Sequence, residues 1–173
     1  SILSNKYGFK VIEDASHAVG ASFNKNFVGC CEFSDAAVFS FHPVKIATTG
    51  EGGMVTTNDR ELWSRMWSYK DHGKSWEAVY ESEHPPGFRW LHTSFGTNWR
   101  MIEMQATIGR IQLTRMNEWS SNRLANANAI WNAAKKLNGL LVPDLSCDGC
   151  SNKCDQTIGC THAAYRCYVF VEG

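Results

Sequence analysis

The sequence has an excess of neither acidic nor basic residues and no long apolar run. Seventeen Lys and Arg balance seventeen Asp and Glu, so the formal net charge at pH 7 is zero. Nucleic-acid binding requires a basic surface that neutralises phosphates, so this balance argues against a general nucleic-acid-binding protein. No apolar stretch approaches the ~20 residues that cross a bilayer, so we expect no membrane partner. The length of 173 residues predicts one domain, or one domain and part of another.

Several common catalytic motifs are also absent. The chain has no phosphate-binding G-x-x-x-x-G-K-[ST] loop, no H-E-x-x-H zinc pair and no G-x-S-x-G turn. The glycine-rich run 50–53 does not match G-x-G-x-x-G, because it is followed by a strand-like pattern and not by a helix. We therefore interpret this run as a tight turn.

The cysteines are odd in number and unevenly placed. Disulfide scaffolds are typical of small secreted domains, whereas this chain has enough apolar sequence for a core, so we expect a reduced protein in the cytoplasm. Five of the seven cysteines follow residue 146, near His162, at positions Cys147, Cys150, Cys154, Cys160 and Cys167. We interpret them as unpaired thiols in a loop, with a zinc-binding interaction module as the alternative.

Hydrophobic patterning predicts alternating strands and helices, and hence an α/β fold. The expected strands are Lys10–Glu13, Ala36–Phe41, Gly53–Thr57 and Tyr165–Val171. Residues 42–52 are too few for a helical crossover, so the second and third strands are not expected to be parallel neighbours. A mixed sheet follows. Because the chain lacks an initial Met and stops after a strand-like run, we expect a piece of a longer protein.

The expected helices are residues 1–8, Asn58–Lys70, Met101–Met116 and Glu118–Asn138. Asn58 is expected to cap the second helix, with Glu61 three residues later. Apolar residues at helical spacing predict core contacts, in the third helix at Ile108, Ile111 and Leu113 and in the fourth at Leu124, Ala127, Ile130, Trp131, Ala134 and Leu137.

The segment Asp71–Asn98 is rich in Gly, Pro, His and aromatic residues and is expected to be a long loop. Loops of this length are often functional. Two interpretations stay open, a substrate-facing lid or a loop packed on its own aromatic side chains. The residues concerned are His72, His84, His92, Trp76 and Trp90.

The most informative residues stand at the ends of two expected strands. Asp14 ends the first strand, Ser40 lies near the end of the second, and Lys45 follows five residues later. In open α/β sheets, ligands gather outside the carboxyl ends of strands. A lysine that forms a Schiff base, a hydroxyl for a phosphate and a carboxylate for a ring nitrogen together suit pyridoxal 5′-phosphate (PLP).

The order of motifs along the chain resembles the PLP-dependent sugar aminotransferase family, also called the DegT/StrS family. The resemblance is carried by Ile12–Ala18, Ser40–Lys45, Thr48–Gly53, Gly96–Met101 and the Gln105 to Leu113 stretch. It implies part of the large domain of a fold-type I PLP enzyme, with a mixed, mostly parallel sheet and flanking helices. By this resemblance, residues 1–117 belong to the PLP-binding domain and residues 118–173 to a connecting helix and the start of a small C-terminal domain.

The resemblance also implies roles for individual residues. Lys45 looks like the Schiff-base lysine that shuttles the proton, and Asp14 like the partner of the pyridine nitrogen. His17 is expected to face the cofactor ring, Ser40 to bind the phosphate, and Asn98 to reach the phosphate of the partner subunit's cofactor. The implied assembly is a homodimer with shared active sites. Arg100 belongs to the same motif as Asn98 but receives no role.

The implied reaction moves an amino group, typically from glutamate, onto a keto sugar carried by a nucleotide. Two alternatives stay open. One is a PLP-dependent sugar dehydratase or isomerase of the same fold; in related dehydratases a histidine replaces the lysine, so Lys45 favours transamination. The other is a non-catalytic regulator that binds PLP or a sugar nucleotide.

Overall fold

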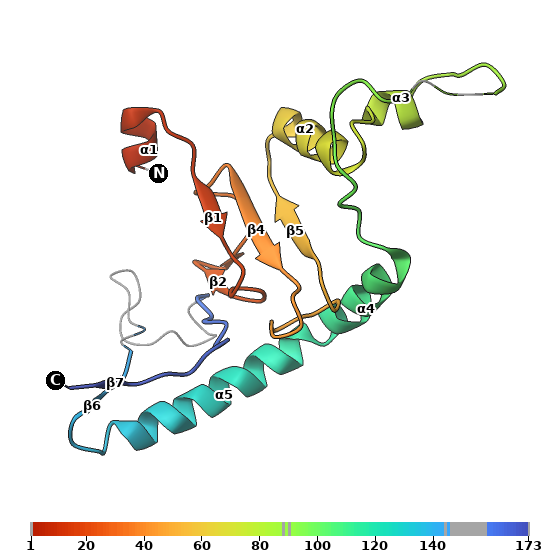
Figure 1. Cartoon of the computed structure of the whole chain (residues 1–173). Coiled ribbons are helices and arrows are strands. Elements are labelled where there is room, and N and C mark those ends of the chain that lie inside the picture. Colours follow the sequence, from red (N-terminus) through yellow and green to blue (C-terminus); the bar gives the residue numbers. More distant parts are fainter. Residues whose placement is uncertain (1, 88, 90, 144, 146–158, 173) are drawn as a thin grey trace.

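The structure is a computed structural model that describes residues 2–87, 89, 91–143, 145 and 159–172. Its central element is a three-stranded sheet in the order β1-β4-β5, formed by Ile12–Asp14, Ala36–Ser40 and Gly53–Thr56 (Figure 1). β1 and β4 are parallel, and β4 and β5 are antiparallel. The sheet is therefore mixed, and the expectation that the last two strands are not parallel neighbours is confirmed.

Two small antiparallel pairs lie outside this sheet. β2 (Ser22–Phe23) pairs with β3 (Asn26–Phe27), and β6 (Leu140–Leu141) pairs with β7 (Phe170–Val171). The strand expected over Tyr165–Val171 is thus much shorter than predicted, because only its last two residues find a ladder partner among the described residues.

The helices are α1 (Ile2–Tyr7), α2 (Arg60–Lys70), α3 (Trp76–Tyr80), α4 (Glu103–Thr114) and α5 (Met116–Ala134). α5 is the longest and runs past the lower end of the sheet toward β6 and β7, while α2 and α3 lie beyond β5 (Figure 1). Within the described residues, no helix combines the length and the apolar character that a bilayer crossing requires.

Two details of the helices differ from expectation. The N-cap of α2 is Asp59, whose Oδ1 accepts hydrogen bonds from the backbone N–H groups of Glu61 and Leu62. Asn58 instead donates from its side chain to the carbonyl of Cys30. Asp59 is the better cap because its carboxylate also interacts favourably with the helix dipole. In addition, the expected long loop contains α3, which Ser75 caps through the N–H of Ala78.

Two hydrophobic clusters are arranged along α5. The first cluster, here called the sheet cluster, includes Ala37, Phe39, Phe41, Ile46 and Met116. The second, here called the helix-end cluster, is formed by Ala127, Trp131 and Ala164. α5 therefore joins two separately packed regions, with its first turn under the sheet and its last turns against the C-terminal segment.

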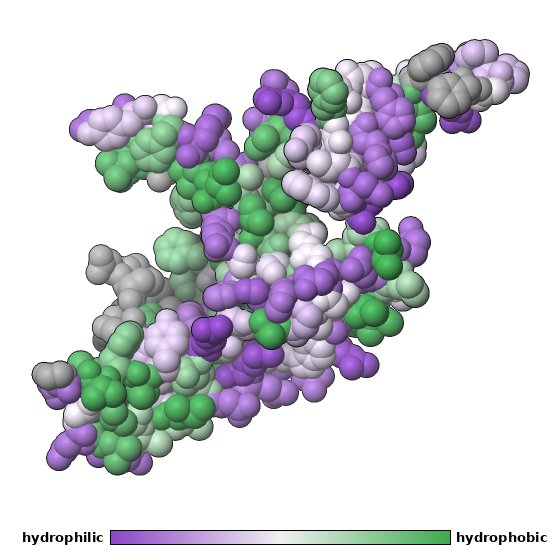
Figure 2. All heavy atoms as spheres, in the orientation of Figure 1, coloured by the Kyte–Doolittle hydropathy of each residue, from purple (hydrophilic) through white to green (hydrophobic). Residues whose placement is uncertain are grey.

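Several predicted core residues are exposed. On α4, Ile108, Ile111 and Leu113 expose 45%, 53% and 45% of their surface, and on the last helical stretch Ile130 and Leu137 expose 51% and 59%. The expectation of core contacts is wrong for these five in this structure, because about half of the surface of each residue is exposed. Figure 2 shows such apolar surface on the sheet and on α4.

Candidate active site

Asp14 is the last residue of β1, where the strand reaches the carboxyl edge of the sheet. It stands opposite Val38 of β4, and its Oδ1 accepts a hydrogen bond of 3.0 Å from the backbone N–H of Ser16. Hydrogen bonding from Ser16, through side chain and backbone, lowers the pKa of Asp14, and the charges of His17 and Lys45 act in the same direction. The carboxylate is therefore an anion at neutral pH, and it is open to a ligand because the side chain is exposed.

Ser40 ends β4 on the same edge of the sheet. Because β1 and β4 are parallel, their carboxyl ends lie together, and Ser40 follows two residues after the partner of Asp14. The Oγ atom of Ser40 accepts a bond of 3.3 Å from the backbone N–H of His42. A hydroxyl that accepts a bond can still donate its own proton, so Ser40 retains a donor for an anion.

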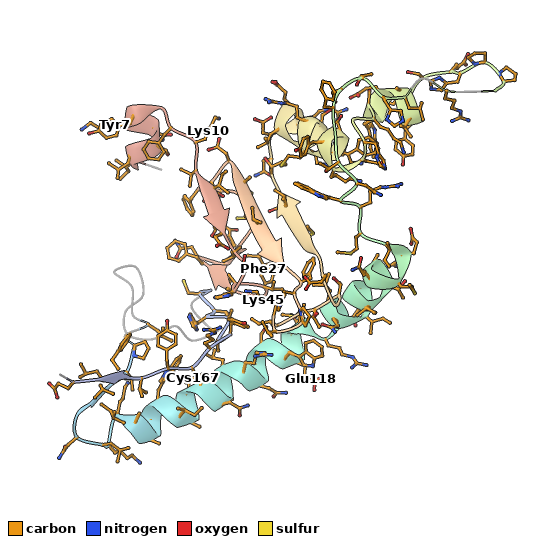
Figure 3. All side chains as sticks on the ribbon, viewed as in Figure 1. Tyr7, Lys10, Phe27, Lys45, Glu118 and Cys167 are labelled. Atoms are coloured by element: carbon orange, nitrogen blue, oxygen red, sulfur yellow. The ribbon has the colours of Figure 1, made fainter. Side chains whose placement is uncertain are left out.

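Lys45 lies in the loop between β4 and β5, below the end of the sheet and above α5 (Figure 3). Its backbone N–H donates to the carbonyl of His42 at 2.9 Å, which closes a turn. The next two residues, Ile46 and Ala47, are 5% and 1% exposed and pack into the sheet cluster. Burial of Ile46 and Ala47 thus anchors the Lys45 backbone in the core, and the Lys45 side chain extends from this anchored position.

The segment after Lys45 is held against α4 by hydrogen bonds and close packing. The backbone N–H of Thr48 donates to Gln112 Oε1 at 2.7 Å, and Gln105 Nε2 donates to the carbonyl of Glu51 at 2.9 Å. A Cβ atom on Gly109 would lie 2.9 Å from Thr49 Cγ2, so α4 and the loop are in direct contact there. The position of the lysine loop therefore depends on α4 as well as on the sheet.

Tyr165 is a site residue that sequence reasoning missed. Its ring centroid lies 4.3 Å from that of His17, with 35° between the ring planes, and 5.3 Å from Lys45 Nζ. The only signal in the sequence was an aromatic residue at the start of an alternating apolar run, which indicates a strand. Nothing local showed that this ring would reach a loop far earlier in the chain.

The structure brings four of the five predicted residues to one edge of the sheet, but Asn98 lies elsewhere. Asn98 forms an isolated β-bridge with Asp71 beyond the end of α2, and its Oδ1 accepts a bond of 3.4 Å from Arg100 Nε. Arg100 and Lys74 each place a nitrogen 3.3 Å from Oδ1 of the buried Asp71. No described contact joins Asn98 to Asp14 or Lys45.

The aromatic side chains of the long segment largely pack on one another. Trp76 contacts Trp63 and Trp67, each with ring centroids 5.2 Å apart, and Tyr80 at 4.3 Å. This packing favours the structural interpretation over a substrate-facing lid for Trp76, whereas Trp90 lies outside the described residues.

The cysteine cluster is described only in part. Cys147, Cys150 and Cys154 lie outside the described residues, whereas Cys160 is buried and Cys167 half-buried. In the part of the chain that the structure describes, no group of three potential metal ligands occurs.

Comparisons with known proteins identify the family and the fold. A family profile described as the DegT/DnrJ/EryC1/StrS aminotransferase family matches residues 1–162. The chain is 32% identical over 147 residues to the spore coat polysaccharide biosynthesis protein SpsC of Bacillus subtilis, covering 85% of this chain and 37% of that protein. It is 39% identical over 116 residues to GDP-perosamine synthase of Caulobacter vibrioides, covering 67% of this chain and 28% of that protein.

Among solved structures, the aminotransferase from Psychrobacter cryohalolentis superimposes with a TM-score of 0.88 at 51% identity, covering 99% of this chain and 42% of that one. The chain therefore belongs to the DegT/DnrJ/EryC1/StrS aminotransferase family, as its motifs indicated. It forms part of the fold-type I aminotransferase fold. It spans about a third of the length of the curated relatives it matches.

Proposed function

We propose that the complete protein is a PLP-dependent aminotransferase that converts a nucleotide-linked keto sugar into an amino sugar, with glutamate as the amino donor. The observation that carries this proposal is that one amine and one anionic carboxylate lie at the same carboxyl edge of the sheet. Lys45 and Asp14 come from separate segments, and the charge of Lys45 contributes to the lowered pKa of Asp14. Family membership supports the same reaction class.

The residues at this edge fit pyridoxal phosphate. Asp14 is held anionic by its hydrogen bonds, as the partner of a protonated ring nitrogen must be. Ser40 offers a hydroxyl at a strand end, where it can donate to the phosphate. His17 adds a flat ring beside them, and Lys45 supplies the amine that would bind the cofactor aldehyde.

When bound, pyridoxal phosphate supplies an aldehyde that captures amines and a ring that withdraws electrons from a neighbouring carbon. The protein's own tasks are narrower. The Asp14 carboxylate would keep the ring nitrogen of the bound cofactor protonated, and Lys45 Nζ would accept a proton and return it. Ile46 and Ala47 keep the lysine backbone still during this transfer, because both are buried in the sheet cluster.

The names of relatives support the substrate class. Besides GDP-perosamine synthase, the chain is 37% identical over 113 residues to a UDP-4-amino-4,6-dideoxy-N-acetyl-β-L-altrosamine transaminase of Helicobacter pylori. Both names describe amino sugars attached to a nucleotide. We extend to this protein only the shared class, a nucleotide-linked keto sugar.

We also propose that Asn98 serves the active site of a partner subunit in a homodimer. Its place beyond α2, away from Lys45, suits a residue that reaches across an interface. It is presented on a fixed backbone, because the N–H of Thr97 donates to the carbonyl of Tyr69 and that of Trp99 donates to the carbonyl of Lys70.

The proposed division into a PLP-binding region, 1–117, and a second region, 118–173, is supported by the change of packing partners along α5, although Ala163 and Tyr165 of the second region also pack with the sheet cluster. Met116 packs into the sheet cluster, whereas Ala127 and Trp131 pack into the helix-end cluster. α5 therefore passes from the sheet cluster to the helix-end cluster, as expected for a helix that connects two regions. A cytoplasmic location, inferred from cysteine usage, is part of the same proposal.

The test is covalent trapping of the cofactor. The complete protein is incubated with pyridoxal phosphate, reduced with borohydride and digested, and the modified lysine is located by mass spectrometry. The label is expected on Lys45, and Lys45→Ala should lose both the label and amine transfer. Lys135→Ala, an exposed change at the end of α5, is the control that should retain both. Normal turnover by Lys45→Ala would exclude the mechanism.

A second experiment, with ¹⁵N-labelled glutamate, separates the alternatives. A regulator would bind pyridoxal phosphate or a sugar nucleotide without consuming glutamate. A dehydratase or isomerase would change the sugar without transferring nitrogen from ¹⁵N-labelled glutamate. Transfer of ¹⁵N to the sugar is the result that the proposal requires.

A further inference from the structure

We propose that Tyr165 is a positioning residue whose ring supports the Lys45 ammonium and the His17 imidazole at the site. This inference rests on the proposed function only for the role of Lys45 in amine transfer. It adds a residue from the C-terminal segment to a site otherwise built from the first half of the chain. The proposal is based on the contacts that the Tyr165 ring makes with Lys45 and His17.

Two side chains from different loops meet on this one ring. Lys45 Nζ lies 5.3 Å from the ring centroid, within the ~6 Å at which a cation is attracted to an aromatic face. The imidazole of His17 lies against the ring with a centroid distance of 4.3 Å. One aromatic side chain therefore contacts two of the residues proposed to hold the cofactor.

Hydrogen bonds and buried residues fix the backbone that leads to Tyr165. Ser22 and Thr161 exchange two backbone hydrogen bonds, of 3.0 and 2.9 Å, which attach the C-terminal segment to β2. Ala163 and Ala164 are each 5% exposed, and Ala164 adopts a positive φ of 46°. Tyr165 follows directly and packs against the sheet cluster. Such over-determined geometry is typical of a positioned residue.

The charges around Lys45 explain why a neutral support is useful there. Asp14 is the anion that attracts Lys45 and His17, and the Arg166 guanidinium lies 5.6 Å from the same Tyr165 ring. A carboxylate placed at the ring position would form an ion pair with Lys45 and hold its nitrogen. An aromatic face attracts the ammonium more weakly, so it can orient Lys45 and still release it.

The first test measures how exposed and reactive the Lys45 amine is. The complete, cofactor-free protein is treated with trace acetic anhydride, and acetylation of Lys45 is compared with that of exposed Lys135 by mass spectrometry. The Tyr165 ring lies against the amine and shields it from the reagent, so Tyr165→Leu should raise the Lys45 to Lys135 acetylation ratio about two- to fivefold. Tyr165→Phe keeps the aromatic face and should leave the ratio unchanged.

The second test separates positioning from a general loss of structure. Tyr165→Leu should lower kcat about tenfold while KM for glutamate stays within about twofold, because Lys45 is misplaced but the binding groups remain. Tyr165→Phe, which keeps the aromatic ring, should retain the kcat of the wild type. Tyr168→Leu is the matched control, since Tyr168 lies three residues later, is 58% exposed and contacts Phe170.

The outcomes are decisive in both directions. A change in Tyr165→Leu that is absent from Tyr165→Phe and Tyr168→Leu supports the positioning role. Equal behaviour of the Leu and Phe variants, or no change in either, overturns it. If borohydride places no label on Lys45, the proposed function fails, yet the acetylation ratio still decides whether the ring holds this amine.

Discussion

The side chain of Gln112 on α4 accepts a hydrogen bond of 2.7 Å from the backbone N–H of Thr48, three residues after Lys45. This bond ties the loop that carries the proposed nucleophile to a helix that is distant in sequence. Gln112→Leu removes the acceptor from a half-buried N–H, and such a loss costs about 1–3 kcal/mol in the free energy of unfolding. Denaturant unfolding measures the loss, and the yield of borohydride label on Lys45 should fall with it.

The matched variant is Gln112→Glu, which keeps an oxygen acceptor at the same position. It should retain most of the stability and most of the label. If the Leu and Glu variants are equally stable, the bond to Thr48 does not hold the loop.

Two glycines in the same loop provide a second prediction. Gly50 and Gly52 both have positive φ, 84° and 152°, but a Cβ on Gly50 meets nothing within 4 Å. A Cβ on Gly52 would lie 2.7 Å from Thr49 Oγ1 and 2.8 Å from Met101 Cε. Gly52→Ala should therefore destabilise the protein by about 1–3 kcal/mol more than Gly50→Ala, because it adds overpacking to the backbone strain. Thermal unfolding of both variants checks the difference, and equal melting temperatures would contradict it.

Asp14→Asn tests the role of the charge at the end of β1. The amide keeps the size of the side chain and can still accept from Ser16, but it cannot hold a proton on an opposing nitrogen. We expect turnover to fall by at least about 100-fold, the usual scale for loss of one electrostatic contact in a transition state, with a much smaller loss of cofactor binding. Steady-state kinetics and cofactor titration measure the two effects. Unchanged turnover would refute the role.

The same carboxylate predicts a dependence of stability on pH. The pKa of Asp14 is lowered in the folded protein, first by hydrogen bonding from Ser16 and then by nearby positive charge. Its contribution is therefore present above the ordinary carboxyl value of 3.8 and is lost as the pH falls through the lowered value. Unfolding measured from pH 6 to pH 2 should show a shallower acid decline for Asp14→Asn than for the wild type. If the two curves of unfolding free energy against pH run parallel, ionisation of Asp14 contributes nothing to stability.

Asn98 can be tested by mixing subunits. If Asn98 serves the partner's site, a heterodimer of Lys45→Ala and Asn98→Ala subunits contains one intact site, although each homodimer is defective. Statistical mixing should then give about a quarter of wild-type activity. If Asn98 acts within its own subunit, mixing restores nothing. The control is a mixture in which both subunits carry Lys45→Ala. It contains no intact site in any pairing and should stay inactive.

Much of the site could be predicted because its signals are local. Asp14 and Ser40 stand at strand ends that apolar patterning identifies, and Lys45 follows in the loop after the second strand. Parallel pairing of β1 with β4 brings the two strand ends together. The antiparallel partner β5 was also predictable, since the connection is too short for a crossover. These features depend on periodicity and chain length.

The features that were missed depend on tertiary contacts. Tyr165 reaches the site through a bridge between Ser22 and Thr161, and no local pattern encodes that pairing. The exposure of Ile108 and Ile111 was missed for the opposite reason, since periodicity shows that a face is apolar and not what covers it.

The bridge between Ser22 and Thr161 also joins two parts of the chain that are synthesised at different times. Lys45 and its strands leave the ribosome before Tyr165, which is synthesised much later. Contacts so distant in sequence close a large loop and form slowly. The contact between the lysine loop and the Tyr165 ring is therefore expected to form late in folding.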